Sequence, residues 1–411
     1  MAESRSHIPS LLSALLFIFG ALTFFSVALL MGVTALGTFL AGQSVGSQQT
    51  IILTVSGFQA LILVGAAFVA IQRFRQQSFA KQDASFNITA GHIIISLSLV
   101  ALVLVSGYLI NQSNTANWLL LPVLTLPAVV LPLFVLLGLG IRGIPLGTRW
   151  QSWNVFGLAM TLTPFFLVFL ELFALVFIVG IAVVVMMSQP GFEMEMQQLV
   201  SQMESIDPQS PAAQEFLIPY VVNPGVIAWS VVYFALIVPL LEELLKPLGV
   251  WFLARKLTSP AQGFALGALS GCAYGLIETL GVSGQSTDWA ALLLTRIGTG
   301  ALHITTSALM GAAIVYAIRE RRYLRLFGTY IVAIALHGLW NTLAIFFAFA
   351  TLSDTYELHN ALRDWLLPLN IGMAMLTVIL IAILMGSNRM MKSSLPASVN
   401  TIVPPSENQS S

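Results

Sequence analysis

The sequence predicts an all-α protein, a polytopic bundle of about ten transmembrane helices with both termini in the cytoplasm. Of its 411 residues, 57% are apolar and only 8% are charged, whereas a soluble domain carries about 25% charged residues. The 17 basic and 17 acidic side chains cancel, so no net positive field favours nucleic acid as a partner. Cys272 is the single cysteine, which excludes an intrachain disulfide and a metal site made of cysteines alone. The expected partner is the lipid bilayer, and the expected location is the cell membrane.

Ten apolar stretches are each long enough to cross the ~30 Å hydrocarbon core as a helix. They lie near residues 11–40, 50–72, 90–110, 118–141, 153–187, 226–256, 261–282, 289–318, 325–350 and 365–386. The first stretch is too long for a signal peptide and lacks a convincing cleavage site, so we expect an uncleaved anchor. The fifth is longer than one perpendicular crossing requires, which predicts a tilted span or one that projects beyond the membrane.

The basic residues support this count, because they alternate between the connections of the predicted spans. Fourteen of the 17 fall on one side of the membrane: Arg5, Arg73, Arg75, Lys81, Arg142, Arg149, Arg255, Lys256, Arg319, Arg321, Arg322, Arg325, Arg389 and Lys392. The opposite connections hold Arg363, while Lys246 and Arg296 lie inside spans. Since basic loops stay in the cytoplasm, both termini are predicted to be cytoplasmic and the number of spans to be even.

The distribution of charge also predicts how the chain is divided. The expected parts are a five-span region of unassigned role at 1–187, an acidic extracytoplasmic loop at 188–223, a four-span core at 224–350, a final span at 351–392 and a disordered cytoplasmic tail at 393–411. In the loop, apolar residues recur at three- and four-residue steps from Phe192 to Ile206, which predicts an amphipathic helix. We interpret it as a helix at the membrane interface, with a lid beside a site as the alternative.

The four-span core contains seven ionisable side chains inside its predicted spans. They are Glu242, Glu243, Lys246, Glu278, Arg296, His303 and His337. Counted from the cytoplasmic helix ends, the carboxylates and imidazoles lie ~18–26 Å into the bilayer at ~1.5 Å per residue. A charge at such a depth costs roughly 2.5–3.5 kcal/mol or more, so these groups normally face a cavity or a partner. Their similar depth on four consecutive helices predicts one polar pocket.

Local spacing refines this prediction. Lys246 follows Glu242 by four residues and Glu243 by three, so the lysine can pair with one carboxylate while the other stays free for chemistry. Asn341 follows His337 by four residues and shares its helix face. Across the core, three carboxylates meet two fixed cations, so one carboxylate must take a proton, share one or bind a cation.

The seventh and sixth spans carry backbone features that affect packing. Gly263, Gly267, Gly271 and Gly275 repeat every four residues and predict a smooth strip for close contact with another helix. Pro239 and Pro247 bracket the glutamate pair and predict kinks in the sixth span.

Each of these residues also has a purely structural explanation. A histidine in a membrane helix more often forms an interhelical hydrogen bond than takes part in catalysis, and a Glu–Lys pair can simply hold two helices together. Glu171, alone in its span, favours a structural or coupling role. The joint occurrence on four consecutive helices is what favours a functional site.

Four motifs resemble those of the PrsW family of intramembrane proteases. Glu242-Glu243-Leu-Leu-Lys246 is similar to the EExxK motif of that family, and Gly271 to Glu278 is similar to its glycine- and aromatic-rich segment ending in Glu. The other two motifs run from Arg296 through His303 to Gly311, and from His337 to Asn341. The resemblance covers residues 224–350, and the same plan is shared more distantly with CAAX prenyl-proteases and bacteriocin-processing proteases. Thr279 stands where the family usually has Asn, and Tyr274 where it commonly has Phe.

The resemblance implies an intramembrane endopeptidase that cuts membrane-anchored proteins such as an anti-sigma factor. It implies catalytic roles for Glu242, Glu243, Glu278, His303 and His337, with Lys246, Arg296 and Asn341 in support. Two mechanisms stay open: a glutamate that activates water without a metal, or a Zn²⁺ ion held by His303, His337 and Glu243 with the second glutamate as base. A proton- or ion-coupled transporter and a non-catalytic protease-like scaffold are the alternative functions.

Overall fold

A computed structural model describes residues 7–84, 86–112, 116–204, 206–207, 210–284, 288–356 and 362–395. Within these ranges the chain is helical, has no named strand, and contains ten helical stretches long and apolar enough to cross a membrane. The all-α, ten-span fold class is therefore confirmed, and the placement of the termini in the cytoplasm stays a prediction. The predicted disordered tail lies outside the described residues from 396 onward.

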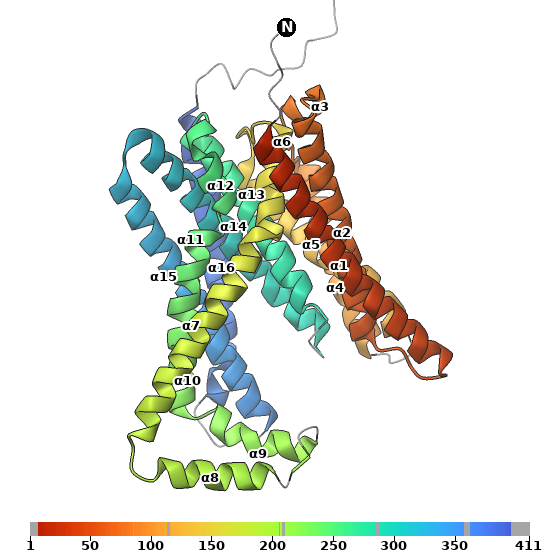
Figure 1. Cartoon of the computed structure of the whole chain (residues 1–411), viewed down its shortest axis with the longest axis vertical. Helices are drawn as coiled ribbons and strands as arrows, with labels where there is room; N and C mark the ends of the chain where they lie inside the picture. The colour runs from red at the N-terminus through yellow and green to blue at the C-terminus, as the bar shows by residue number, and fades with distance from the viewer. Residues whose placement is uncertain are drawn as a thin grey trace, which may run out of the picture.

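The N-terminal region forms one side of the molecule (Figure 1). Its helices are α1 (Ile8–Leu40), α2 (Ser47–Phe74), the short α3 (Ser78–Lys81), α4 (Ala90–Gln112) and α5 (Asn117–Ile141). α1 packs along α2, and α4 packs along α5. Many large apolar side chains are exposed on these helices, as expected for surfaces that face lipid.

The fifth predicted span consists of two helices, α6 (Arg149–Met160) and α7 (Leu162–Met187). They meet at Thr161, whose φ of −125° and ψ of −75° interrupt the α-helical geometry. The two parts pack differently: α6 contacts α2 and α13, while α7 contacts α11. The unusual length of this stretch is therefore explained by a break that connects the N-terminal region to the rest of the bundle.

The acidic loop contains two helices, α8 (Phe192–Met203) and α9 (Pro211–Val221). α8 confirms the helix that the spacing of apolar residues predicts, whereas α9 was not expected. Both run across the ends of the spans at one end of the molecule (Figure 1). Their position there is consistent with a helix at the membrane interface.

The sixth span is the most irregular one in the described chain. It is built from α10 (Pro224–Val231), a π-helical turn η1 (Val232–Ile237), α11 (Val238–Leu245), α12 (Leu248–Leu253) and the 3₁₀ turn η2 (Ala254–Lys256). Pro239 has no N–H to continue the α-helical ladder, and the π-helical turn lies directly before it. Pro247 separates α11 from α12. The prolines thus isolate α11 as the short segment that carries the glutamate pair.

At the centre of the bundle, α13 (Pro260–Val282) and α14 (Trp289–Glu320) are the most buried of the ten candidate spans. A Cβ atom added at Gly267 would lie 2.1 Å from the backbone oxygen of Ser307, and one at Gly271 would lie 2.1 Å from that of His303. The predicted glycine strip therefore faces α14 and lets the two backbones touch. Around this pair pack α15 (Tyr323–Thr355) and α16 (Leu366–Ser393), with the short turn η3 (Arg363–Trp365) between them.

We expect Gly267→Ala to destabilise the protein by roughly 1–3 kcal/mol, because its new methyl group must push α13 away from α14. The measurement is the thermal unfolding midpoint in detergent. Gly180→Ala is the matched control, since nothing lies within 4 Å of a Cβ at that position on α7. Equal midpoints for the two variants would show that the close contact is not needed.

Candidate functional site

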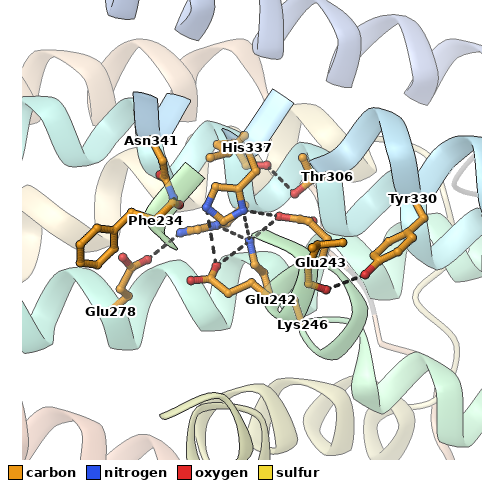
Figure 2. Close-up of polar contacts among 12 residues, drawn as sticks. Phe234, Glu242, Glu243, Lys246, Glu278, Thr306, Tyr330, His337 and Asn341 are labelled. Carbon is orange, nitrogen blue, oxygen red and sulfur yellow. Dashed lines mark hydrogen bonds and ion pairs between the residues drawn. The ribbon is translucent and has the colours of Figure 1, made fainter. Parts of the chain in front are cut away.

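A buried lysine stands at the centre of the predicted site. Lys246, at the end of α11, has 0% of its side chain exposed. Its Nζ lies 2.6 Å from Oε1 of Glu243 and 3.1 Å from Oε2 of Glu242 (Figure 2). Both carboxylates come from the preceding helical turn, so the lysine pairs with the two glutamates together and not with one alone. This ammonium supplies the positive charge that two buried carboxylates require.

The two glutamates have different surroundings. Oε1 of Glu243 also lies 2.7 Å from Nδ1 of His337, and Glu243 is fully buried. Oε2 of Glu242 lies 3.8 Å from Nε2 of His337, beyond hydrogen-bond range. Glu243 is thus held by a lysine and a histidine, whereas Glu242 is held less tightly.

His303, on α14, connects the lysine to a third carboxylate, that of Glu278. Its Nδ1 lies 2.8 Å from Nζ of Lys246, and its Nε2 lies 2.6 Å from Oε2 of Glu278 on α13. Because the ammonium can only donate, Nδ1 of His303 accepts and Nε2–H donates to Glu278. Nη2 of Arg296, from the preceding part of α14, lies 2.8 Å from the same Glu278 oxygen. The predicted residues of α11, α13 and α14 therefore form one continuous polar chain.

His337 has the opposite tautomer. Its Nδ1 lies near both Nζ of Lys246, at 3.4 Å, and the carboxylate of Glu243, at 2.7 Å. The short contact to the carboxylate indicates that Nδ1–H donates to Glu243, which leaves Nε2 as an acceptor directed towards Glu242. The imidazole rings of His303 and His337 meet edge to face, with their centroids 5.6 Å apart.

Counting charges in this cluster reproduces the imbalance seen in the sequence. Arg296 neutralises Glu278, and Lys246 neutralises one of Glu242 and Glu243. With both histidines neutral, one negative charge remains, and it lies on the glutamate pair. A carboxylate that is short of a counter-charge in a water-poor site is suited to accept a proton.

The amide of Asn341 hydrogen-bonds to the sixth span, although Asn341 shares a helix face with His337. Its Nδ2 donates a 2.7 Å hydrogen bond to the backbone oxygen of Phe234, in the π-helical turn η1 (Figure 2). A π-helical turn shifts its carbonyl groups out of the regular α-helical ladder, so they are free for side chains. Asn341 therefore ties α15 to the irregular part of the sixth span.

Three residues that were not predicted as site residues also contact the site. The ring of Tyr274 meets that of His303 edge to face at 5.2 Å, and Nζ of Lys246 lies 5.4 Å from its centroid. The hydroxyl of Ser270 donates a 2.6 Å hydrogen bond to the backbone oxygen of Lys246, and the hydroxyl of Tyr330 donates one of the same length to that of Leu240. Ser270, Tyr274 and Glu278 follow one another at four-residue steps, and this spacing was the available indication in the sequence.

Glu171 lies near the cluster but is not part of it. Its backbone oxygen accepts a 2.8 Å hydrogen bond from the hydroxyl of Tyr233, and its Oε1 is buried with no hydrogen-bond partner among the described residues. This places α7 against the sixth span.

The candidate metal ligands converge on the lysine. Nδ1 of His303, Nδ1 of His337 and Oε1 of Glu243 lie 2.8, 3.4 and 2.6 Å from Nζ of Lys246. A Zn²⁺ ion needs these atoms at about 2.0–2.2 Å and would be repelled by the ammonium already among them. Within the described part of the chain, no group of three His, Cys, Asp or Glu side chains is arranged to hold a metal ion. As arranged, the cluster does not fit a bound metal.

Comparison with known proteins yields one match. The family described as PrsW family intramembrane metalloprotease matches residues 169–383, just over half of the chain. The match extends beyond 224–350 at both ends and includes Glu171, α8 and α9. No curated protein and no solved structure matches the chain.

We expect Lys246→Met to destabilise the protein by about 3–5 kcal/mol, because two buried carboxylates lose their counter-charge. The measurement is the thermal unfolding midpoint in detergent. The double variant Lys246→Met/Glu243→Gln removes a negative charge as well, so it should recover part of the loss. If the single and double variants unfold at the same temperature, the ion pair does not stabilise the fold.

Proposed function

This chain belongs to the PrsW family of intramembrane proteases, and we propose that it cuts membrane-anchored proteins at the cluster built on Glu242, Glu243 and the two histidines. It is a multi-pass membrane enzyme whose substrates are membrane proteins. Family membership favours this function over a transporter or a non-catalytic scaffold. The finer assignments that follow are part of the proposal.

The observation that carries the proposal is that the two glutamates have different contacts. Glu243 is engaged by both Lys246 and His337 at 2.6 and 2.7 Å. Glu242 makes the longer contact to the lysine, at 3.1 Å, and faces Nε2 of His337 across 3.8 Å. Glu242 is therefore the proposed general base, while Glu243 orients Lys246 and His337.

The geometry supports activation of water between Glu242 and His337. Two acceptor atoms 3.8 Å apart can each accept a hydrogen bond from one water molecule, since each bond needs about 2.7–2.8 Å. Glu242 takes a proton from this water while the water oxygen bonds to the scissile carbonyl carbon. The same proton then passes from Glu242 to the amine nitrogen as the C–N bond breaks.

The developing oxyanion needs hydrogen-bond donors that are not already fully used. Lys246 is engaged by two carboxylates and His303, and Nε2–H of His303 is engaged by Glu278. The second amide hydrogen of Asn341 is the proposed donor, because the one hydroxyl hydrogen of Tyr274 is engaged by Glu242. Glu278 and Arg296 position His303, and the side chain of Glu278, one third exposed, marks the end of the cluster where substrate enters.

The remaining parts of the proposal come from the sequence. The proposed location is the cell membrane, and an anti-sigma factor is the proposed substrate type. The proposed division keeps 1–187 as a separate five-span region and 224–350 as the catalytic core. α9 contacts α10 at the start of the sixth span, and α8 contacts α7.

We expect Glu242→Gln to lower kcat by about 10²–10⁴-fold, because glutamine cannot accept the proton of the attacking water. Glu243→Gln and His303→Ala are also expected to abolish most turnover, since they misplace the lysine and its partners. The assay reconstitutes the protein with host membrane proteins, including anti-sigma factors, and detects new peptide termini by mass spectrometry.

Glu193→Gln, on the exposed face of α8, is the matched control for loss of one carboxylate and should keep wild-type turnover. A cooperative thermal unfolding transition first shows that each variant is folded. Wild-type rates in folded Glu242→Gln, Glu243→Gln and His303→Ala would eliminate the proposed site.

We also expect cleavage to survive treatment with EDTA or 1,10-phenanthroline, because the metal that the family description implies has no ligand set here that is free of Lys246. Metal analysis of the purified protein is expected to give the same content for wild type and the His303→Ala/His337→Ala variant. Stoichiometric zinc that disappears in this double variant, together with loss of activity in chelator, would contradict the expectation. It would mean that Lys246 leaves the cluster when the metal binds.

A further inference from the structure

A polar cavity lies at the opposite end of the bundle from α8 and α9. It has a volume of about 310 Å³. Five segments that are distant in sequence meet around it, from the residue before α1 to the turn η2. The side chains used in the argument are those of His7, Arg73, Lys81, Thr148, Trp150 and Lys256.

The cavity is strongly basic. Arg73, Lys81 and Lys256 line it, and no carboxylate is among the described lining residues. None of these three cations forms an ion pair within the described chain. Asp83 bridges to Thr148 through its backbone, but its side chain does not line the cavity. Three positive charges around one half-open cavity favour an anionic occupant.

The pKa of His7, which lines the cavity, is affected by the same positive charges. Burial lowers the pKa of its imidazole, and the positive charges of Arg73 and Lys256 lower the pKa further. His7 is therefore neutral near pH 7, and an anion that enters the cavity would raise its pKa again. Its ring lies edge to face against Trp150, with the centroids 4.9 Å apart.

Two buried nitrogen atoms at this cavity lack hydrogen-bond partners. Trp150 is only 6% exposed, and its Nε1 has no partner in the described structure. Nδ1 of His7 is likewise buried and without a partner. Indole Nε1–H is a donor only, and leaving a buried donor unsatisfied costs about 1–3 kcal/mol. Both residues line the cavity, and a ligand oxygen that reaches Nε1–H of Trp150 would satisfy this donor.

The start of α6 adds a third feature that favours an anion. Thr148 caps this twelve-residue helix, and Trp150 lies in its first turn. The N-terminal end of a helix carries a partial positive charge and is a common site for phosphate oxygens. The guanidinium carbon of Arg73 lies 5.9 Å from the centroid of the Trp150 ring, so the indole also helps to position this cation.

We propose that this cavity binds the phosphate group of an anionic ligand, through Arg73, Lys256 and Nε1–H of Trp150. The cavity lies at the ends of the spans, where basic side chains gather and lipid headgroups are found. The phosphate of an anionic phospholipid and free phosphate share the chemistry that these residues recognise. Such a site assigns a function to the five-span region, which supplies every described wall of the cavity except Lys256.

The test measures binding to the purified full-length chain in a neutral detergent. The three probes are dihexanoyl phosphatidylglycerol, dihexanoyl phosphatidylcholine and inorganic phosphate. We expect an anionic probe to raise the unfolding midpoint in a concentration-dependent way and phosphatidylcholine to have no effect. Stronger binding of phosphatidylglycerol identifies a lipid headgroup as the ligand, and equal or stronger binding of phosphate identifies the free anion.

The variants separate this cavity from general surface charge. Arg73→Gln/Lys256→Gln should weaken binding about tenfold or more, and Trp150→Phe, which keeps an aromatic ring but loses the N–H, should weaken it severalfold. Arg142→Gln/Arg389→Gln removes two exposed charges at the same end of the bundle and should leave binding unchanged. If the first double variant fails to fold, the single variant Lys81→Gln tests the same cavity at an exposed residue, and it should also weaken binding. Absence of binding by both anionic probes, or an equal loss in the control variant, would overturn the proposal.

Discussion

The ammonium of Lys246 is the interaction on which the rest of the core depends. It is fully buried and lies within 3.4 Å of two carboxylates and two imidazoles from α11, α14 and α15. Burying a charge in a bilayer is tolerated only when its partners are fixed in place. The helices that carry these partners must therefore be fixed relative to one another. The glycine strip of α13 and the π-helical turn of the sixth span lie where they help to fix them.

Two backbone features set those positions. The glycine strip brings α13 against α14, so that Glu278 and His303 come within 2.6 Å of each other. The π-helical turn before Pro239 frees the carbonyl of Phe234 for Asn341, which ties α15 to the sixth span. Both features use backbone atoms to place side chains, since a membrane offers no hydrophobic force that would pull one helix onto another.

The two polar sites differ in how they balance charge. In the core, cations and carboxylates nearly cancel, and the small negative excess is suited to proton transfer. At the far end of the bundle, three cations face a cavity with no lining carboxylate in the described chain, which is suited to holding an anion. The break at Thr161 between α6 and α7 allows the same predicted span to contribute to both regions, with α6 beside the basic cavity and α7 beside α11.

The sequence by itself determined the class of fold and the membership of the core cluster. Spans of about 20 apolar residues have few alternatives in a bilayer, and ionisable groups at one depth must find one another. The tertiary structure alone decided which groups pair: Lys246 contacts both glutamates, His337 holds Glu243, and Asn341 turns to Phe234. Spacing along one helix indicates a shared face, but distances between helices depend on how their backbones pack. For the same reason the basic cavity could not be predicted, because its walls come from five segments that only folding brings together.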